Sequence, residues 1–139
     1  RDNLRIVSDI GSRLPIYCTS QGKVFLAHMS RTSAEALLRA QHMTQFTPHT
    51  ITDLTALMQE IDLCRTNGYA IENGEYKIGL RSISAPVYTV EGKARYTVGV
   101  IGMFRSTRSD EFLAAVEQVC ATASMISTAL GYRKTEELL

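Results

Sequence analysis

The sequence predicts an α+β fold, and two observations predict it. Residues 68–104 read as a short strand, a polar loop that contains glycine, and two longer strands joined by a turn at residues 91–93. On both sides of this stretch, apolar residues recur at spacings of three and four, which is the pattern of amphipathic helices. We therefore expect a small sheet that is packed between helices.

Length and composition favour a single globular domain. The chain has 139 residues, of which 45% are hydrophobic and 21% charged, and its formal charge is +1. A balance so close to neutral gives no reason to expect direct binding to DNA or to an anionic membrane. The apolar runs are shorter than a membrane span and the first residues do not resemble a secretion signal, so we expect a cytoplasmic protein. The three cysteines are far apart and each is set among apolar residues, so we expect reduced, buried thiols at Cys18, Cys64 and Cys120.

The segment before the sheet predicts one strand and three helices. The strand covers residues 4–10 and ends at Gly11. A first helix is expected from Thr19 or Ser20 to about residue 29, and a second over residues 33–40. The third begins at Thr52 or Asp53 and ends at residues 67–68, with an apolar stripe formed by Leu54, Leu57, Met58, Ile61 and Cys64.

The two longer strands have unlike faces. In the first, Ser82, Ser84 and Pro86 alternate with three apolar residues, so one face carries small polar groups. The second strand covers residues 96–104, and its two glycines, at positions 99 and 102, are expected to leave room beside the sheet. No residue here is an obvious nucleophile or metal ligand. The pattern therefore favours a binding cavity over a catalytic centre.

A long final helix closes the domain. Ser109 is the expected cap, and two acids follow it in the first turn, where the helix dipole favours negative charge. The helix is expected to run to Leu130 and to stop at Gly131. Its packing stripe is expected to consist of Phe112, Val116, Val119, Ala123, Ile126 and Leu130.

Other kinds of site receive little support. The histidines are His28, His42 and His49, and none lies beside a nucleophile motif, which argues against a hydrolase. With Cys18 they share one region, but no pair has a metal-ligand spacing, so no metal site is expected. The residues from Ser20 to Lys23 could present backbone N–H groups to an anion, although a plain capped helix is the better explanation of this segment alone. Glu72 and Glu75 could bind ligand hydroxyls or hold Arg81, but loop acids are more often solvated.

Five blocks of sequence, taken in order, resemble the effector-binding domain of IclR-type bacterial transcription regulators. The blocks are LP at 14–15 with TSQGKVFLA at 19–27, NGYA at 67–70, GLRSISAPV at 79–87, IS at 126–127 and LGY at 130–132. The resemblance covers residues from about Leu4 to Tyr132. It does not reach the family's N-terminal winged helix-turn-helix, so the whole chain, residues 1–139, is expected to be an effector-binding fragment that also lacks the first strands of that domain.

The resemblance implies a GAF/PAS-like (profilin-like) fold, a two-layer α/β arrangement in which a curved antiparallel sheet is flanked by helices and one face carries a small-molecule pocket. It implies no enzymatic activity and no cofactor. The expected partners are a small organic-acid effector and other copies of the chain, in a homodimer or homotetramer, with DNA bound only through the missing domain. Alternatives are an enzyme that uses the same cavity and a ligand-free dimerisation module. The effector-binding residues implied by the resemblance or by the local chemistry are Ile6, Leu14, Ser20, Gln21, Gly22, Glu72, Arg81, Ser82, Gly99 and Ile101.

Two departures from the family pattern bear on the effector. The family commonly has cysteine where Ser82 stands, and members that bind very small keto acids have serine where Gly99 and Ile101 stand. The loss of two hydroxyls and the gain of an isoleucine predict a roomier or more apolar pocket. We therefore expect an aromatic acid or a larger sugar or hydroxy acid.

Overall fold

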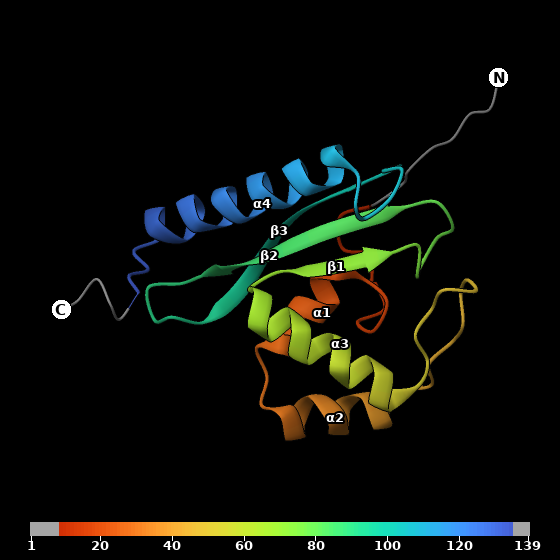
Figure 1. Cartoon of the computed structure of the whole chain (residues 1–139). Helices are drawn as coiled ribbons and strands as arrows, with labels where there is room; N and C mark the ends of the chain where they lie inside the picture. The colour runs from red at the N-terminus through yellow and green to blue at the C-terminus, as the bar shows by residue number, and fades with distance from the viewer. Residues whose placement is uncertain (1–8, 135–139) are drawn as a thin grey trace.

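The computed structural model describes residues 9–134, in which three strands form one antiparallel sheet in the order β1-β2-β3. The strands are β1 (Ala70–Asn73), β2 (Arg81–Tyr88) and β3 (Ala94–Gly102). The central strand, β2, pairs with both neighbours, so that Ser84 lies opposite Ala70 on one side and Gly99 on the other. Figure 1 shows the sheet crossing the middle of the molecule.

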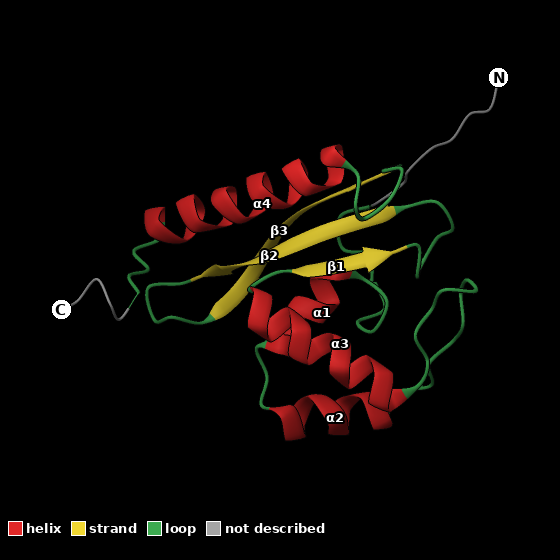
Figure 2. Cartoon of the chain, viewed as in Figure 1, coloured by secondary structure: helices red, strands yellow, loops and turns green. Residues whose placement is uncertain are grey.

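Four helices surround this sheet within the described part of the chain: α1 (Ser20–Ala27), α2 (Arg31–Arg39), α3 (Leu54–Asn67) and α4 (Asp110–Ala129). Side chains cap each of them, because Thr19, Ser30, Asp53 and Ser109 accept a hydrogen bond from a backbone N–H in the first turn. Gly68 ends α3 with a φ of 79°, a left-handed conformation that glycine adopts without steric cost. Figure 2 shows helices above and below the strands.

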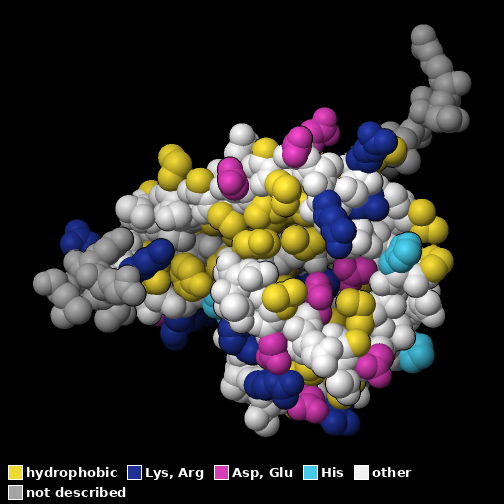
Figure 3. All heavy atoms as spheres, viewed as in Figure 1, with side chains coloured by type: hydrophobic (Ala, Val, Ile, Leu, Met, Phe, Trp, Pro, Cys, Tyr) yellow, Lys and Arg dark blue, Asp and Glu magenta, His cyan; other side chains and the backbone are white. Residues whose placement is uncertain are grey.

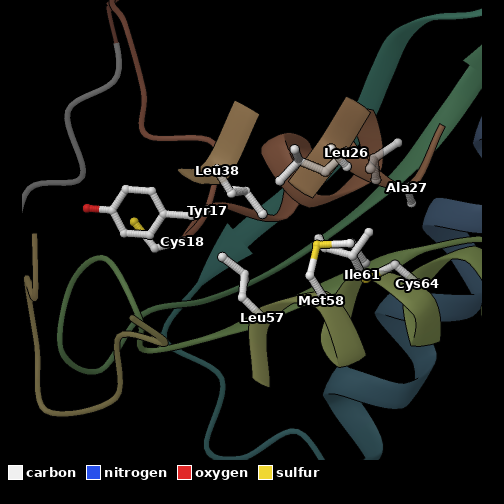
Figure 4. Packing of buried hydrophobic residues seen from close by; sticks show 12 residues of the cluster. Tyr17, Cys18, Leu26, Ala27, Leu38, Leu57, Met58, Ile61 and Cys64 are labelled. Atoms are coloured by element: carbon white, nitrogen blue, oxygen red, sulfur yellow. The ribbon is translucent and has the colours of Figure 1, made fainter. Parts of the chain in front are cut away.

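The helices cover both faces of the sheet and so divide the core in two. On one face, α4 buries Phe112, Val116 and Val119 against the apolar side of β2. On the other face, α1 packs on the sheet, α3 packs on α1, and α2 lies outermost (Figure 1). The expected α+β class is confirmed, and the sheet is the middle layer of a sandwich rather than one of two layers. Figure 4 shows the second core, in which Leu26, Leu57 and Ile61 meet.

The helix α4 combines a buried stripe with an exposed apolar side. It is long and apolar enough to cross a membrane by length and composition alone, yet such helices also occur in soluble cores. Phe112, Val116, Val119 and Ala123 are buried as the spacing predicts. The last turns differ, because Ser127 is buried and Ile126 is 38% exposed. Ser127 is buried because its hydroxyl accepts a hydrogen bond from Tyr88 N, at 2.9 Å, and so ties α4 to β2.

Several boundaries differ from the sequence predictions. The second helix begins at Arg31, since Ser30 and not a later residue caps it. The strand β3 ends at Gly102, so Met103 and Phe104 lie beyond it. Of the strand predicted over residues 4–10, only Asp9 and Ile10 are described, and neither is in a strand. The predicted cysteine state agrees for Cys18 and Cys64, which are buried and free, while Cys120 is half-buried.

Candidate functional site

A cavity of about 260 Å³ opens between the loop before α1, the loop after β1 and the far end of β3. Its buried lining is formed by Thr19, Glu72 and Leu80, while Arg13 and Lys77 line it from exposed positions. The full lining is Asp9, Ser12, Arg13, Leu14, Thr19, Gln21, Glu72, Tyr76, Lys77, Leu80 and Ile101. The cavity therefore has two cations and the acid Asp9 at exposed positions, a buried acid at its inner end, and apolar and aromatic walls.

Glu72 is the buried acid of this cavity, with a relative exposure of 2%. Two donors hold its carboxylate: Glu75 N lies 2.7 Å from Oε2, and Ser82 Oγ lies 3.1 Å from Oε1. Burial is the main reason that the pKa of Glu72 is raised, and the Glu75 carboxylate adds to the effect. A carboxylate has more acceptor sites than these two donors occupy, so Glu72 can still accept a hydrogen bond from a ligand.

Behind Glu72 lies a buried ion pair between Lys23 and Glu75. Lys23 Nζ is 2.9 Å from the Glu75 carboxylate, 3.0 Å from Ile71 O and 3.3 Å from Glu60 Oε1. The lysine side chain is fully buried and the Glu75 side chain is 5% exposed. Burial alone would lower the pKa of Lys23, but Glu75 and Glu60 outweigh it and the pKa is raised. All three ammonium protons therefore have partners, and Lys23 stays charged.

The Lys23 side chain connects the inner cavity to the outside of the sheet. Glu60, its third partner, is on α3 and lines a second cavity of about 220 Å³ at the free side of β1. Leu63, Cys64 and Ile71 also line that cavity. In Figure 3, hydrophobic side chains gather in a band between α4 and α3, where this cavity opens. Contacts thus run from Glu72 through Glu75 and Lys23 to Glu60 on α3.

Four of the ten predicted site residues line the cavity together: Leu14, Gln21, Glu72 and Ile101. Ser82 does not line it but holds Glu72 from behind. Ile6 lies outside the described residues. The structure also shows that Glu72 and Glu75 are buried, so the alternative that they are solvated loop acids is wrong.

The other four predicted residues lie elsewhere. Ser20 is buried, and its hydroxyl is 2.7 Å from that of Ser84 on β2. Gly22 packs against the backbone of Ile16, and its N–H donates to the cap residue Thr19, so this N–H is already paired. Arg81 donates to Asn73 Oδ1 and Phe104 O, and so ties β1 to the segment that follows β3.

Glycine is present at position 99 for a different reason from the expected one, which was to leave room beside the sheet. A Cβ atom at this position would overlap the carbonyl of Ile83 and come within 2.5 Å of Ser84 Oγ. The space beside Gly99 is thus filled by β2 itself. Glycine is required there because the two strands approach closely, and the expectation of empty space for a ligand is wrong at this position.

The basic and aromatic part of the lining was not predicted from the sequence. Arg13 lies in the loop between Gly11 and Pro15, and Tyr76 and Lys77 follow directly on the buried Glu75. These residues are on loops, which have no periodicity that would indicate the direction of their side chains. The only available indication was their position beside the predicted acids and beside Leu14.

The chemistry of the described residues gives little support to catalysis. Burial raises the pKa of Cys18 to about 12, with contributions from Glu75 and Glu72, and that of Cys64 to about 11. Thiols with such pKa values are protonated at neutral pH and are poor nucleophiles. Among residues 9–134, no group of three or more His, Cys, Asp or Glu side chains is arranged to hold a metal ion.

Comparison with known proteins adds a family and a set of relatives. Residues 1–128 match the family model described as bacterial transcriptional regulator IclR C-terminal. The HTH-type transcriptional repressor AllR of Escherichia coli K12 is 29% identical over 130 residues, which are 94% of this chain and 48% of AllR. The chain thus spans about half the length of the curated relatives it matches. These relatives are transcriptional repressors, not enzymes.

Solved structures show the same fold. The C-terminal domain of the E. coli transcriptional regulator KdgR has a TM-score of 0.79 and 33% identity, over 88% of this chain and 75% of that one. The Agrobacterium tumefaciens repressor BlcR also has a TM-score of 0.79, with 31% identity over 91% of this chain and 51% of BlcR.

Proposed function

This chain belongs to the IclR family of bacterial transcriptional regulators, as their C-terminal domain, and from that premise we propose that its 260 Å³ cavity binds a small hydroxy acid, either aromatic or sugar-derived. We propose further that binding changes how a DNA-binding domain elsewhere in a cytoplasmic protein engages its operator. The observation that carries the proposal is the pairing of a buried acceptor, Glu72, with the exposed cations Arg13 and Lys77 in one cavity.

The two ends of the cavity suit two different groups of one ligand. A carboxylate is stabilised near Arg13 and Lys77, since charge-assisted hydrogen bonds are about twice as strong as neutral ones. A hydroxyl can donate to Glu72, whose two existing donors fix the direction of its carboxylate. Tyr76 and Ile101 supply apolar and aromatic wall area. A simple acid without a hydroxyl would leave the buried Glu72 without a ligand partner.

Thermal unfolding with matched ligand pairs tests this proposal. We expect 4-hydroxybenzoate to shift the melting temperature more than benzoate, and gluconate more than a simple short-chain acid. A ligand at a hundred times its Kd adds about 2.7 kcal/mol, which is a shift of several degrees for a domain of this size. In Glu72→Gln the preference for the hydroxyl should be lost, and in Arg13→Gln binding of either acid should weaken.

A control variant separates these effects from general changes in charge. Glu91→Gln removes an acid in the exposed turn between β2 and β3, far from the cavity lining, and should leave every shift unchanged. Equal shifts for the hydroxylated and plain acids in the wild-type chain would contradict the role of Glu72. No shift with any acid would contradict the effector site itself.

For regulation, the effector must bind one arrangement of the whole protein more tightly than another. A ligand of equal affinity for both arrangements would shift nothing. A tenfold change in operator affinity requires only about 1.4 kcal/mol of coupling. We propose that the coupling acts within a homodimer or homotetramer. The exposed apolar side chains of α4, among them Leu113 and Met125, support self-association, which light scattering would measure.

A further inference from the structure

A further cavity, of about 310 Å³, lies on the opposite face of the sheet from the 260 Å³ cavity that is proposed to bind the effector, here called the effector cavity. It is enclosed by β2, by the C-terminal half of α4 and by the turn at Gly68 that follows α3. No residue within the described range 9–134 lines both cavities. Its volume is at the lower end of the roughly 300–1,000 Å³ that ligand sites occupy.

One wall of this cavity is aromatic and held in place. Tyr88 and Tyr132 stack with ring centroids 4.7 Å apart and an interplanar angle of 24°. The Tyr88 phenol is 2.8 Å from His28 Nε2, while His28 Nδ1 is 2.8 Å from Val24 O. Since a carbonyl can only accept, Nδ1 carries a proton, and in the neutral ring Nε2 accepts from the phenol. Tyr132 N also donates to Ser127 O at 3.0 Å.

The remaining lining is small, hydroxylated and basic. Ala85, Pro86 and Ala123 form apolar surface, and Ser124 and Thr128 add hydroxyls from the exposed side of α4. Among residues 9–134, Lys134 is the single charged residue of the lining, and none of the described lining residues is an acid. Burial, followed by the neighbouring Tyr132, raises the pKa of Tyr88, so the Tyr88 phenol stays protonated at physiological pH.

From this geometry we propose a second small-molecule site, which takes a compact ring carrying one anionic group. The ring fits between the tyrosine wall and the alanine surface, where aromatic contacts favour it. The anion lies within reach of Lys134 and the two hydroxyls of α4. A cavity of about 150 Å³ can hold benzene, so 310 Å³ accommodates one substituted ring.

Cys120 provides a direct measurement of occupancy, because it lines this cavity and is half-buried, whereas Cys18 and Cys64 are buried elsewhere. The rate of Cys120 alkylation by iodoacetamide is measured by mass spectrometry at mildly alkaline pH, since burial raises the pKa of this thiol. We expect benzoate at ten times its half-protecting concentration to slow alkylation about tenfold, by mass action. Neutral benzyl alcohol should protect only at higher concentration.

Three variants test whether the probes that protect Cys120 from alkylation bind in this cavity. Ser124→Leu fills the cavity from the exposed side of α4 and should abolish protection by both probes. Lys134→Gln should weaken protection by benzoate and leave that by benzyl alcohol unchanged. Ile101→Trp obstructs the effector cavity on the other face and should leave protection intact.

The proposal is overturned if benzoate, phenylacetate and 4-hydroxybenzoate all fail to protect Cys120 at about 10 mM. Even a weak site, with a Kd of about 1 mM and roughly 4 kcal/mol of binding free energy, would be mostly occupied at that concentration. It is also overturned if Ser124→Leu keeps the protection, or if Ile101→Trp removes it. The last result would show that the probes act from the effector cavity.

Discussion

Replacement of Lys23 by methionine is expected to be among the most damaging single changes in this chain. The substitution keeps the length of the side chain but removes the ammonium group that contacts Glu75, Ile71 O and Glu60. The Glu75 carboxylate would then be buried without its cation. Removal of one partner from a buried ion pair typically costs 3–5 kcal/mol, since the other charge remains desolvated.

For a domain of 139 residues, a loss of this size corresponds to a fall in melting temperature of roughly 10–20 °C. Urea unfolding followed by circular dichroism measures it directly as a lower midpoint with an unchanged slope. The matched control is Lys93→Met, since Lys93 is exposed and lies 3.9 Å from Glu91. A surface pair of this kind contributes between 0 and about 1 kcal/mol.

A second substitution separates the charge effect from lost packing. Adding Glu75→Gln to Lys23→Met removes the negative charge that is buried without a cation, so the double variant should be more stable than Lys23→Met alone. A stabilising role for the Lys23–Glu75 ion pair is contradicted if the stability of Lys23→Met lies within about 1 kcal/mol of the wild type, or if the double variant is less stable than Lys23→Met.

Three further predictions concern the site and its surroundings. The raised pKa of Glu72 means that the folded state binds its proton more tightly, so stability from this group is full below the unfolded pKa and falls as the pH rises through the folded pKa. Glu72→Gln should remove that fall from a pH series of urea midpoints. Gly99→Ala should cost about 1–3 kcal/mol by overlap with β2, whereas Gly102→Ala, which meets only the ring of Phe104 at 3.4 Å, should stay within about 0.5 kcal/mol in the same unfolding assay. Ser84→Ala should cost about 1–2 kcal/mol of stability, because the buried Ser20 hydroxyl loses one hydrogen-bond partner. In a double-mutant cycle, the variant with both Ser20→Ala and Ser84→Ala should lose less stability than the sum of the losses in the two single variants.

The elements of this fold were largely predictable, because local signals determine them. Asp53 caps the start of α3 and Gly68 ends it, as their capping chemistry indicates, and Ser109 caps the start of α4. The error at α2 has a simple cause: Ser30 and Ser33 are both acceptable caps, and their hydrogen bond joins them in one first turn. The deviation at the end of α4 arises from a tertiary contact, the bond from Tyr88 N to Ser127, which no helical periodicity contains.

The site was predictable only in part, for a different reason. Glu72 and Leu14 could be placed in a pocket because the family resemblance covers their segments. The contributions of Arg13 and Lys77 depend on the paths of two loops, and the sequence pattern carries no information about these paths. The burial of Lys23 was equally hidden, since lysine is almost never fully buried unless it is paired, and its partners are 37 and 52 residues away in the chain.

The Lys23–Glu75 pair also determines where the sheet can grow. On the outer side of β1, Lys23 Nζ donates to Ile71 O, and the Glu75 carboxylate accepts from Asn73 N at 2.9 Å. Two side chains thus occupy one backbone acceptor and one backbone donor of β1, which makes this strand a poor template for another chain. A further strand could pair here only by first separating a buried ion pair. Within the part of the chain that the structure describes, β3 is therefore the side of the sheet at which further strands can be added.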